Sequence, residues 1–139
     1  MKTKLFTLEE ANLLLPEVRK MLGGLRVCRD RVEQLEKDKA IEELSWLQPD
    51  GSVSPQAQTQ LQCLEEEQKK HTASFENNLK MMARLGAQLK DLDQGLVDFF
   101  ASNGDELVCL CWKEGEESIR YWHDLESGFG GRRPVEELG

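Results

Sequence analysis

The feature that most constrains the fold is an apolar repeat with alternating three- and four-residue spacing, found in two long stretches of the chain. The first stretch contains Val18, Met21, Leu25, Cys28, Val32 and Leu35. The second contains Ala57, Leu61, Leu64, Gln68, His71, Phe75, Asn78, Met82, Leu85, Leu89 and Leu92. This spacing is typical of helices that pack along a narrow seam. Because "QPDGSVSP" at 48–55 carries a turn signal between them, the sequence predicts a long antiparallel helical hairpin.

The ends of these helices have local signals of their own. Thr7 and Glu10 form a capping-box pattern that predicts a short N-terminal helix over about 8–14. Pro16 removes a backbone donor, so we expect a kink or a restart there. The predicted boundaries are a helical region over 8–46, a linker over 47–55 and a second helix over 56–92.

After residue 93 the hydrophobic period changes from helical to strand-like. "GLVDFFA" (95–101), "ELVCLCW" (106–112) and "SIRYWHD" (118–124) are short, apolar or aromatic, and separated by glycine-containing turns. They predict a small three-stranded antiparallel β-meander over 95–124, followed by an irregular C-terminal tail over 125–139. The expected fold class is therefore α+β, in a single domain of residues 1–139.

Composition excludes several classes of partner. The formal net charge is −8, and residues 105–139 carry four basic and nine acidic groups, a balance of −5. A chain of this kind without a basic stripe repels phosphate backbones, so no nucleic-acid partner is expected. The sequence also contains no apolar stretch of the roughly 18 residues that a membrane span requires. We therefore expect no membrane association and a soluble, cytoplasmic protein whose cysteines are thiols.

Several ordered motifs carry a resemblance to a known family. They are "FTLEEANLLLPEV" (6–18), "LKDLDQGLVDF" (89–99), "LCW" (110–112), "YWH" (121–123) and "GFGGRRP" (128–134). With these motifs the chain resembles the bacterial domain of unknown function 2203 over nearly its whole length. The resemblance implies a bacterial, cytoplasmic protein with helices and a small sheet, and it supplies no activity, cofactor or site residue.

The first candidate site contains Cys109 and Cys111, which share one face of their strand. With His123 they offer two thiolates and an imidazole to zinc. A tight turn over 114–117 argues against this site because it pairs Val108 with His123 and Leu110 with Tyr121, so the histidine points away from the cysteines. A one-residue slip in register would reverse that conclusion. The competing interpretation is that both cysteines are small buried apolar residues.

His123 has nearby carboxylates on several segments. A candidate polar cluster combines it with Asp98, Glu116, Glu126 and Arg132. A histidine–carboxylate pair can orient a general base, and His123, Asp98 and Glu116 form an alternative divalent-metal set. The competing interpretation is a structural hydrogen bond through which His123 anchors the tail to the sheet. The sequence leaves open whether the protein is an enzyme, and our first expectation is that it holds no cofactor.

The glycine–arginine segment "GFGGRRP" offers guanidinium groups that could hold a small anion. It lacks the ending and the following helix of a phosphate-binding loop. Arg132 has Asp98, Glu116 and Glu126 as candidate salt-bridge partners, and this salt bridge is the interpretation that the sequence favours.

The leading functional prediction is an interaction or oligomerisation protein without enzymatic activity, built on the hairpin and acting as a homodimer or with a protein partner. Its basis is that two helices bury only one stripe each along a long seam. The alternatives are a metal-binding protein or enzyme with a His/carboxylate site on the meander, and a small-anion sensor that uses Arg132. Trp112 and Tyr121 are predicted to lie together on the sheet face that packs on the helices.

Overall fold

The computed structural model describes residues 4–45 and 48–138, which form two compact units. One unit contains the chain up to Gly23 together with the chain from Lys80 onward, and the other is Gly24–Leu79. Residues 46 and 47, at the predicted junction of helix and linker, lie outside the described residues. Within the described ranges, no helix has both the length and the apolar character that crossing a membrane requires.

Helix α1 runs without interruption over Leu8–Ser45, and the predicted capping box is confirmed at its start. The Glu10 N–H donates to Thr7 Oγ1 over 3.1 Å, and the Thr7 N–H donates to Glu10 Oε1 over 2.9 Å. The separate short helix and the restart at Pro16 are wrong, because Pro16 lies inside α1. Interior proline costs about 3 kcal/mol. The fully buried Leu15 and Val18 flank it, and each contributes roughly 1.5–3 kcal/mol of burial that offsets this cost.

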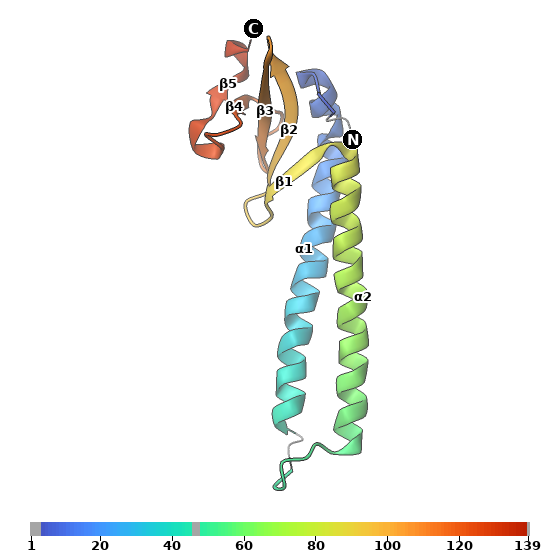
Figure 1. The fold of residues 1–139 in the computed structure, drawn as a ribbon. Coiled ribbons are helices and arrows are strands. Elements are labelled where there is room, and N and C mark those ends of the chain that lie inside the picture. The colour runs from blue at the N-terminus through green and yellow to red at the C-terminus, as the bar shows by residue number, and fades with distance from the viewer. Residues whose placement is uncertain (1–3, 46–47, 139) are drawn as a thin grey trace. The chain divides into compact units, whose positions relative to one another are not determined.

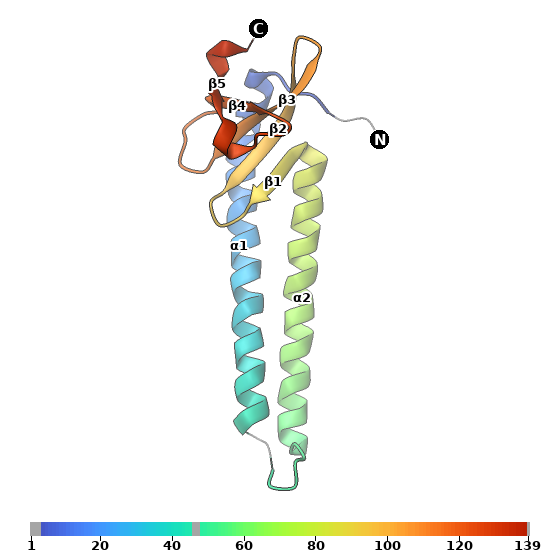
Figure 2. The same cartoon turned by 60° about the vertical axis from the view of Figure 1, so that its left-hand side comes forward.

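The unit Gly24–Leu79 is the helical hairpin, in which α1 and α2 (Pro55–Leu85) run side by side in both views (Figures 1 and 2). The antiparallel register brings Gly24 of α1 close to Asn78 of α2: a Cβ added at Gly24 would lie 3.7 Å from Asn78 Nδ2. Polar side chains cross the seam, since Arg31 Nη2 donates to Glu67 Oε1 over 2.7 Å. Ser54 caps α2 by accepting the Ala57 N–H, and Pro55 takes the first helical position.

Helix α2 ends earlier than the predicted residue 92. Gly86, with a φ of +94°, terminates it, and strand β1 follows over Ala87–Asp91. A side chain at Gly86 would collide with the Phe6 ring, because an added Cβ would lie 2.6 Å from two of its carbons. Only glycine meets both the positive φ and this close approach without strain. The chain therefore turns into a strand although Leu89 and Leu92 continue the apolar spacing.

The sheet is antiparallel and has five strands in the order β1-β2-β3-β4-β5, where three had been predicted. The predicted meander corresponds to β2 (Leu96–Asn103), β3 (Glu106–Lys113) and β4 (Tyr121–Asp124). The predicted irregular tail contains 3-10 turns at Phe129–Gly131 and Val135–Glu137 and the short edge strand β5 (Arg133–Pro134). The α+β class, with a helical hairpin followed by an antiparallel sheet, is confirmed.

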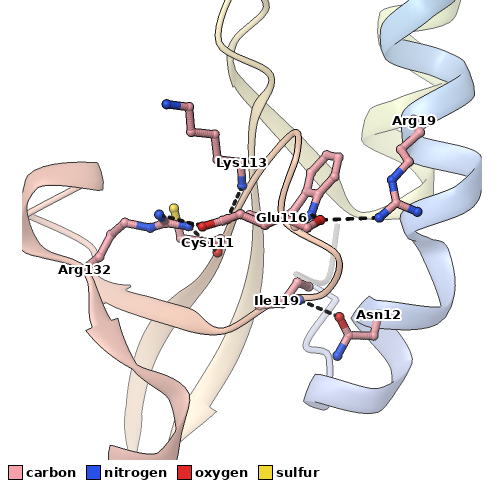
Figure 3. Close-up of polar contacts among 8 residues, drawn as sticks. Asn12, Arg19, Cys111, Lys113, Glu116, Ile119 and Arg132 are labelled. Atoms are coloured by element: carbon pink, nitrogen blue, oxygen red, sulfur yellow. Dashed lines mark hydrogen bonds and ion pairs between the residues drawn. The ribbon is translucent and has the colours of Figure 1, made fainter.

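One face of the sheet forms the core with the first part of α1 and the chain before it. The fully buried side chains on this face are those of Val97, Phe99, Val108, Leu110 and Trp112. Phe6 packs edge-to-face on Phe99, with ring centroids 5.3 Å apart. Polar contacts extend the packing to α1, because Arg19 donates to the Glu116 carbonyl and Asn12 Oδ1 accepts the Ile119 N–H (Figure 3).

The pairing of β3 with β4 differs by one residue from the predicted register. Cys109 pairs with His123 and Cys111 with Tyr121, so these four side chains share the face away from α1. Tyr121 therefore does not lie with Trp112, and Trp122 takes the predicted place opposite Leu110. The physical reason is the connection over residues 114–120. A turn closes with the Glu116 N–H on the Lys113 carbonyl, and the chain then continues through Ile119, which is buried and donates its N–H to Asn12 of α1, before β4 begins.

Candidate metal centre

Three neighbouring strands each contribute one buried side chain to a single cluster: Asp98 from β2, Cys111 from β3 and His123 from β4. Asp98 pairs directly with Cys111 across β2 and β3, which places both side chains on the same face. One ligand-type atom of each residue, an oxygen, a sulfur and a nitrogen, lies within 4.8 Å of the other two. The cluster lies on β2, β3 and β4, the three inner strands of the five-stranded sheet.

The hydrogen bonds of His123 determine how its imidazole is protonated. Nδ1 lies 2.6 Å from the carbonyl oxygen of Asp124, which can only accept, so Nδ1 carries a proton. Nε2 lies 3.1 Å from Asp98 Oδ2. In the neutral imidazole, Nε2 therefore directs a lone pair at a carboxylate oxygen. Two electron-rich atoms at this distance require a cation between them, either a proton or a metal ion.

Asp98 and His123 are the buried polar side chains of the described chain, at 3% and 4% exposure. The second carboxylate oxygen, Asp98 Oδ1, is buried and has no hydrogen-bond partner among the described residues. An uncompensated buried carboxylate oxygen costs free energy, and in natural proteins such a group usually meets an ordered water, an ion or a ligand. The cluster is therefore under-satisfied as an internal hydrogen-bond network.

Burial also raises the pKa values of the two thiols on this face of the sheet. It raises the pKa of Cys109 to about 11 and that of Cys111 to about 12, and the nearby Asp98 carboxylate acts in the same direction. Without a metal ion both side chains are thus protonated at neutral pH. A thiolate at Cys111 requires a positive charge beside it, which a bound metal supplies.

The cluster lies at the floor of a cleft of about 480 Å³. Besides the three clustered residues and Cys109, its lining is mostly apolar, with Lys90, Asp91 and Glu126 as the charged members and Leu96, Phe100, Leu125, Gly128 and Phe129 completing the walls. Clefts of this size with apolar walls and a few convergent polar groups are the usual form of small-molecule sites.

The structure separates the residues of the predicted polar cluster. His123 and Asp98 lie together, whereas Glu116 forms a bidentate ion pair with Arg132 at 2.6 and 3.0 Å (Figure 3). Glu116 therefore does not belong to the group of mutually close ligand atoms, in which Cys111 takes the third place. Glu126 is exposed at the cleft.

Arg132 anchors the tail, and the salt bridge predicted for it is confirmed. Its guanidinium also donates to the Cys111 carbonyl over 3.2 Å and lies over the rings of Tyr121 and Phe129, at 4.2 and 4.7 Å. The structural hydrogen bond predicted for His123 is present, but it connects β4 to Asp98 on β2 and not the tail to the sheet. Because the Arg132 guanidinium forms two hydrogen bonds with the Glu116 carboxylate, its charge is already neutralised within the chain.

Cys111 is the member of the cluster that the predicted register missed. Its spacing from Cys109 already placed both thiols on one face, and the one-residue slip considered as an alternative is the pairing that brings His123 to that face. The sequence contains a partial signal for the longer connection, since Ile119 is an isolated apolar residue among polar neighbours.

Comparison with known proteins agrees with the ordered motifs. Residues 4–135 match the family model described as "Uncharacterized conserved protein (DUF2203)". The chain belongs to this family. The matched range contains Asp98, Cys111 and His123, all residues that line the cleft, and both helices. Neither the curated proteins nor the solved structures contain a significant match.

In this DUF2203 chain the cluster combines a hard oxygen donor, an imidazole nitrogen and a sulfur donor. The carbonyl of Asp124 orients the imidazole in the way that outer hydrogen bonds orient metal-bound histidines. The arrangement can hold a divalent cation or a shared proton. With a cation it could polarise a bound water or an oxygen of a ligand in the cleft.

Proposed function

We propose that this DUF2203 protein binds a divalent metal ion of the zinc type through Asp98, Cys111 and His123. The observation that carries the proposal is the orientation of His123. Its Nδ1 lies against a carbonyl, which leaves Nε2 and Asp98 Oδ2, 3.1 Å apart, to share a cation, either a proton or a metal ion. A metal ion between these atoms satisfies both and also gives the cluster the positive charge that Cys111 needs to ionise.

The distances support a tetrahedral ion with little rearrangement. Bonds of about 2.0–2.1 Å to nitrogen and oxygen and about 2.3 Å to sulfur place tetrahedral donor atoms roughly 3.3–3.6 Å apart. The Nε2–Oδ2 separation of 3.1 Å is close to this range, and all three donors already lie within 4.8 Å of one another. Small side-chain rotations are enough to close the remaining gap.

The donor set favours one class of metal. Mg²⁺ and Ca²⁺ prefer oxygen ligands only, whereas a mixed oxygen, nitrogen and sulfur set suits Zn²⁺ and similar transition metals. The reducing cytoplasm expected from the sequence keeps Cys111 available as a thiol, and all four cysteines are free in the structure.

Metal analysis tests the proposal on protein purified without a histidine tag from zinc-supplemented cells. The wild-type chain is expected to contain about one Zn²⁺ per chain, and Asp98→Asn to contain little. The asparagine keeps the size of the side chain and can donate to Nε2, so folding is retained. Cys63→Ser, at an exposed cysteine far from the cluster in sequence, is the matched control and is expected to keep the metal. Wild-type protein without bound metal, in zinc-replete cells and after incubation with Zn²⁺, would contradict the proposal.

We propose self-association of the hairpin as a second function, and the exposed apolar stripe on α1 favours it. Val27, Ile41 and Leu44 are 68%, 60% and 77% exposed, and their spacing places them on one side of the helix. The seam residues Leu25 and Leu35 are buried on the opposite side. Among the described residues of Gly24–Leu79, the fully buried apolar side chains are those of Leu25, Leu35 and Ala57. A hairpin with so small a core gains stability from a partner.

The occupant that fits the stripe is a second copy of the chain. If two α1 helices pair antiparallel about Gln34, Val27 of each faces Ile41 of the other. Such a self-complementary pattern is what a two-fold symmetric interface requires.

Sedimentation measurements test this second proposal. Wild-type protein is expected to dimerise at micromolar concentration, and Ile41→Glu is expected to shift it to monomer. Leu13→Glu is the control because Leu13 is also exposed on α1, at 79%, but pairing about Gln34 places no residue of the partner's α1 opposite it. A wild-type monomer at all working concentrations, or equal effects of the two substitutions, would overturn the proposed interface.

A further inference from the structure

We infer that the metal ion of the proposed function keeps an open coordination position that faces the cleft. There it would take a small organic molecule that offers one metal-binding group and has an apolar body. The inference rests on the proposed metal site and extends it from binding an ion to binding a ligand through that ion. Three protein ligands with a remaining open position are typical of catalytic rather than structural zinc sites.

The first support is that all three donors come from one side. Asp98, Cys111 and His123 project from adjacent strands on the same face of the sheet. An ion held by them therefore has the sheet behind it and the cleft in front. Cys109 lies on the same face, yet it is outside the group of ligand atoms that lie within 4.8 Å of one another among the described residues. The geometry thus supplies three donors and leaves the fourth position to the cleft.

The second support is the chemistry of the opposite walls. Leu96, Phe100, Leu125 and Phe129 line the cleft, and their side chains have no atoms that bind a metal. They offer a surface for an apolar body of a ligand. The volume of about 480 Å³ lies within the roughly 300–1,000 Å³ common for small-molecule sites.

The charged lining residues narrow the class of ligand further. Lys90, Asp91 and Glu126 contribute one positive and two negative charges, so the walls give no strong attraction for a multiply charged anion. The Asp91 carboxylate is also occupied by the backbone and side-chain N–H groups of Gln94. The ligand expected is therefore an aryl or alkyl compound with a single carboxylate, thiolate or hydroxamate, held by the metal at one end and by apolar contact at the other.

Cobalt-loaded protein with two hydroxamates as probes tests the inference. Co²⁺ is introduced into the metal-free protein, and the change of its visible absorption on adding acetohydroxamate or benzohydroxamate is titrated. Both probes are expected to perturb the spectrum, with benzohydroxamate binding roughly ten-fold more tightly because its ring contacts the apolar walls.

A variant in the wall separates ligand binding from metal binding. Leu125 is 54% exposed, so Leu125→Ala should leave the fold and the Co²⁺ spectrum intact while reducing the preference for the aryl probe several-fold. Leu107→Ala, at a 39% exposed leucine of β3 that does not line the cleft, is the control and should leave the preference unchanged.

The outcomes separate binding of a ligand at the open position from binding of the metal ion itself. Protein that binds Co²⁺ but shows no spectral response to either hydroxamate has a closed site, which overturns the inference and leaves metal binding intact. Equal affinities for the two probes overturn the role of the apolar walls. Failure of the wild-type protein to bind Co²⁺ overturns the metal proposal itself. A tighter aryl probe that Leu125→Ala weakens supports the full inference.

Discussion

His123 and Asp98 are joined across the sheet: Nε2 of the histidine on β4 lies 3.1 Å from Oδ2 of the aspartate on β2, with both side chains almost fully buried. The pair spans β3, which separates the two strands. A buried carboxylate depends on its partner much more than an exposed one does, because water cannot replace the lost interaction.

The first prediction concerns this pair in metal-free protein. His123→Ala is expected to lower the free energy of unfolding by about 3–5 kcal/mol, because it leaves the buried Asp98 carboxylate without a cation. Asp98→Asn is expected to cost only about 1 kcal/mol, since the amide can donate to Nε2. Urea denaturation measures both changes. Equal losses in the two variants would show that the charge of Asp98 is not what His123 compensates.

The second prediction concerns the core face of the sheet. Trp112 is fully buried, and its Nε1–H donates to the Glu116 carbonyl over 2.9 Å. Trp112→Ala is expected to cost about 3–5 kcal/mol of stability through the lost packing and the cavity. Tyr121→Ala should cost less, because Tyr121 is only partly buried on the other face. A larger loss of thermal stability in Tyr121→Ala than in Trp112→Ala would contradict the observed register.

The third prediction separates the two arginines of the tail. Arg132→Ala removes charge-assisted hydrogen bonds to Glu116, each worth about 1.5–3 kcal/mol, and should make the segment 125–138 several-fold more sensitive to protease. Arg133→Ala is the matched control, because Arg133 is exposed and its guanidinium lies over the Trp122 ring, 5.4 Å from the ring centroid. Similar cleavage rates in the two variants would show that the Glu116 pair does not hold the tail.

The fourth prediction concerns thiol reactivity in the metal-free protein. Burial raises the pKa of Cys109 to about 11 and that of Cys111 to about 12 from an ordinary 9.0. At pH 8, iodoacetamide should therefore label exposed Cys63 first, as mass spectrometry would detect. Because the pKa values of Cys109 and Cys111 are higher in the folded state than in the unfolded state, the folded state favours the protonated thiols. Their contribution to the free energy of unfolding is therefore fully present below pH 9. That contribution is lost as the pH rises through 11 to 12. Equally fast labelling of Cys111 and Cys63 would contradict the burial.

The helical part of the fold followed from local signals that the structure confirms. The capping box at Thr7, the turn before Pro55 and the heptad spacing each act within a few residues, so sequence reveals them directly. The end of α2 was missed because Leu89 and Leu92 extend the apolar spacing. Gly86 is the residue that ends the helix. The requirement for glycine there comes from the Phe6 ring, which lies against it but is distant in sequence.

The candidate site depends on a register that no local signal determines. The pairing of β3 and β4 is set by the length of the connection, and that length reflects the burial of Ile119 beside Asn12 of α1. A change of one residue moves His123 from one face of the sheet to the other. The sequence could therefore identify His123 and Asp98 as candidates, but it could not join them with Cys111.

A calorimetric titration of metal-free protein with Zn²⁺ measures both the number of ions that the proposed site holds and their affinity. The wild type and Cys63→Ser are expected to saturate at about one Zn²⁺ per chain. Cys111→Ser, which replaces sulfur with a hydroxyl at nearly constant size, should bind at least ten-fold more weakly. Saturating Zn²⁺ at 100 times its dissociation constant should stabilise the wild type by about 2.7 kcal/mol. Wild-type protein that binds no Zn²⁺, or binds it as tightly after Cys111→Ser and Asp98→Asn, would contradict the account.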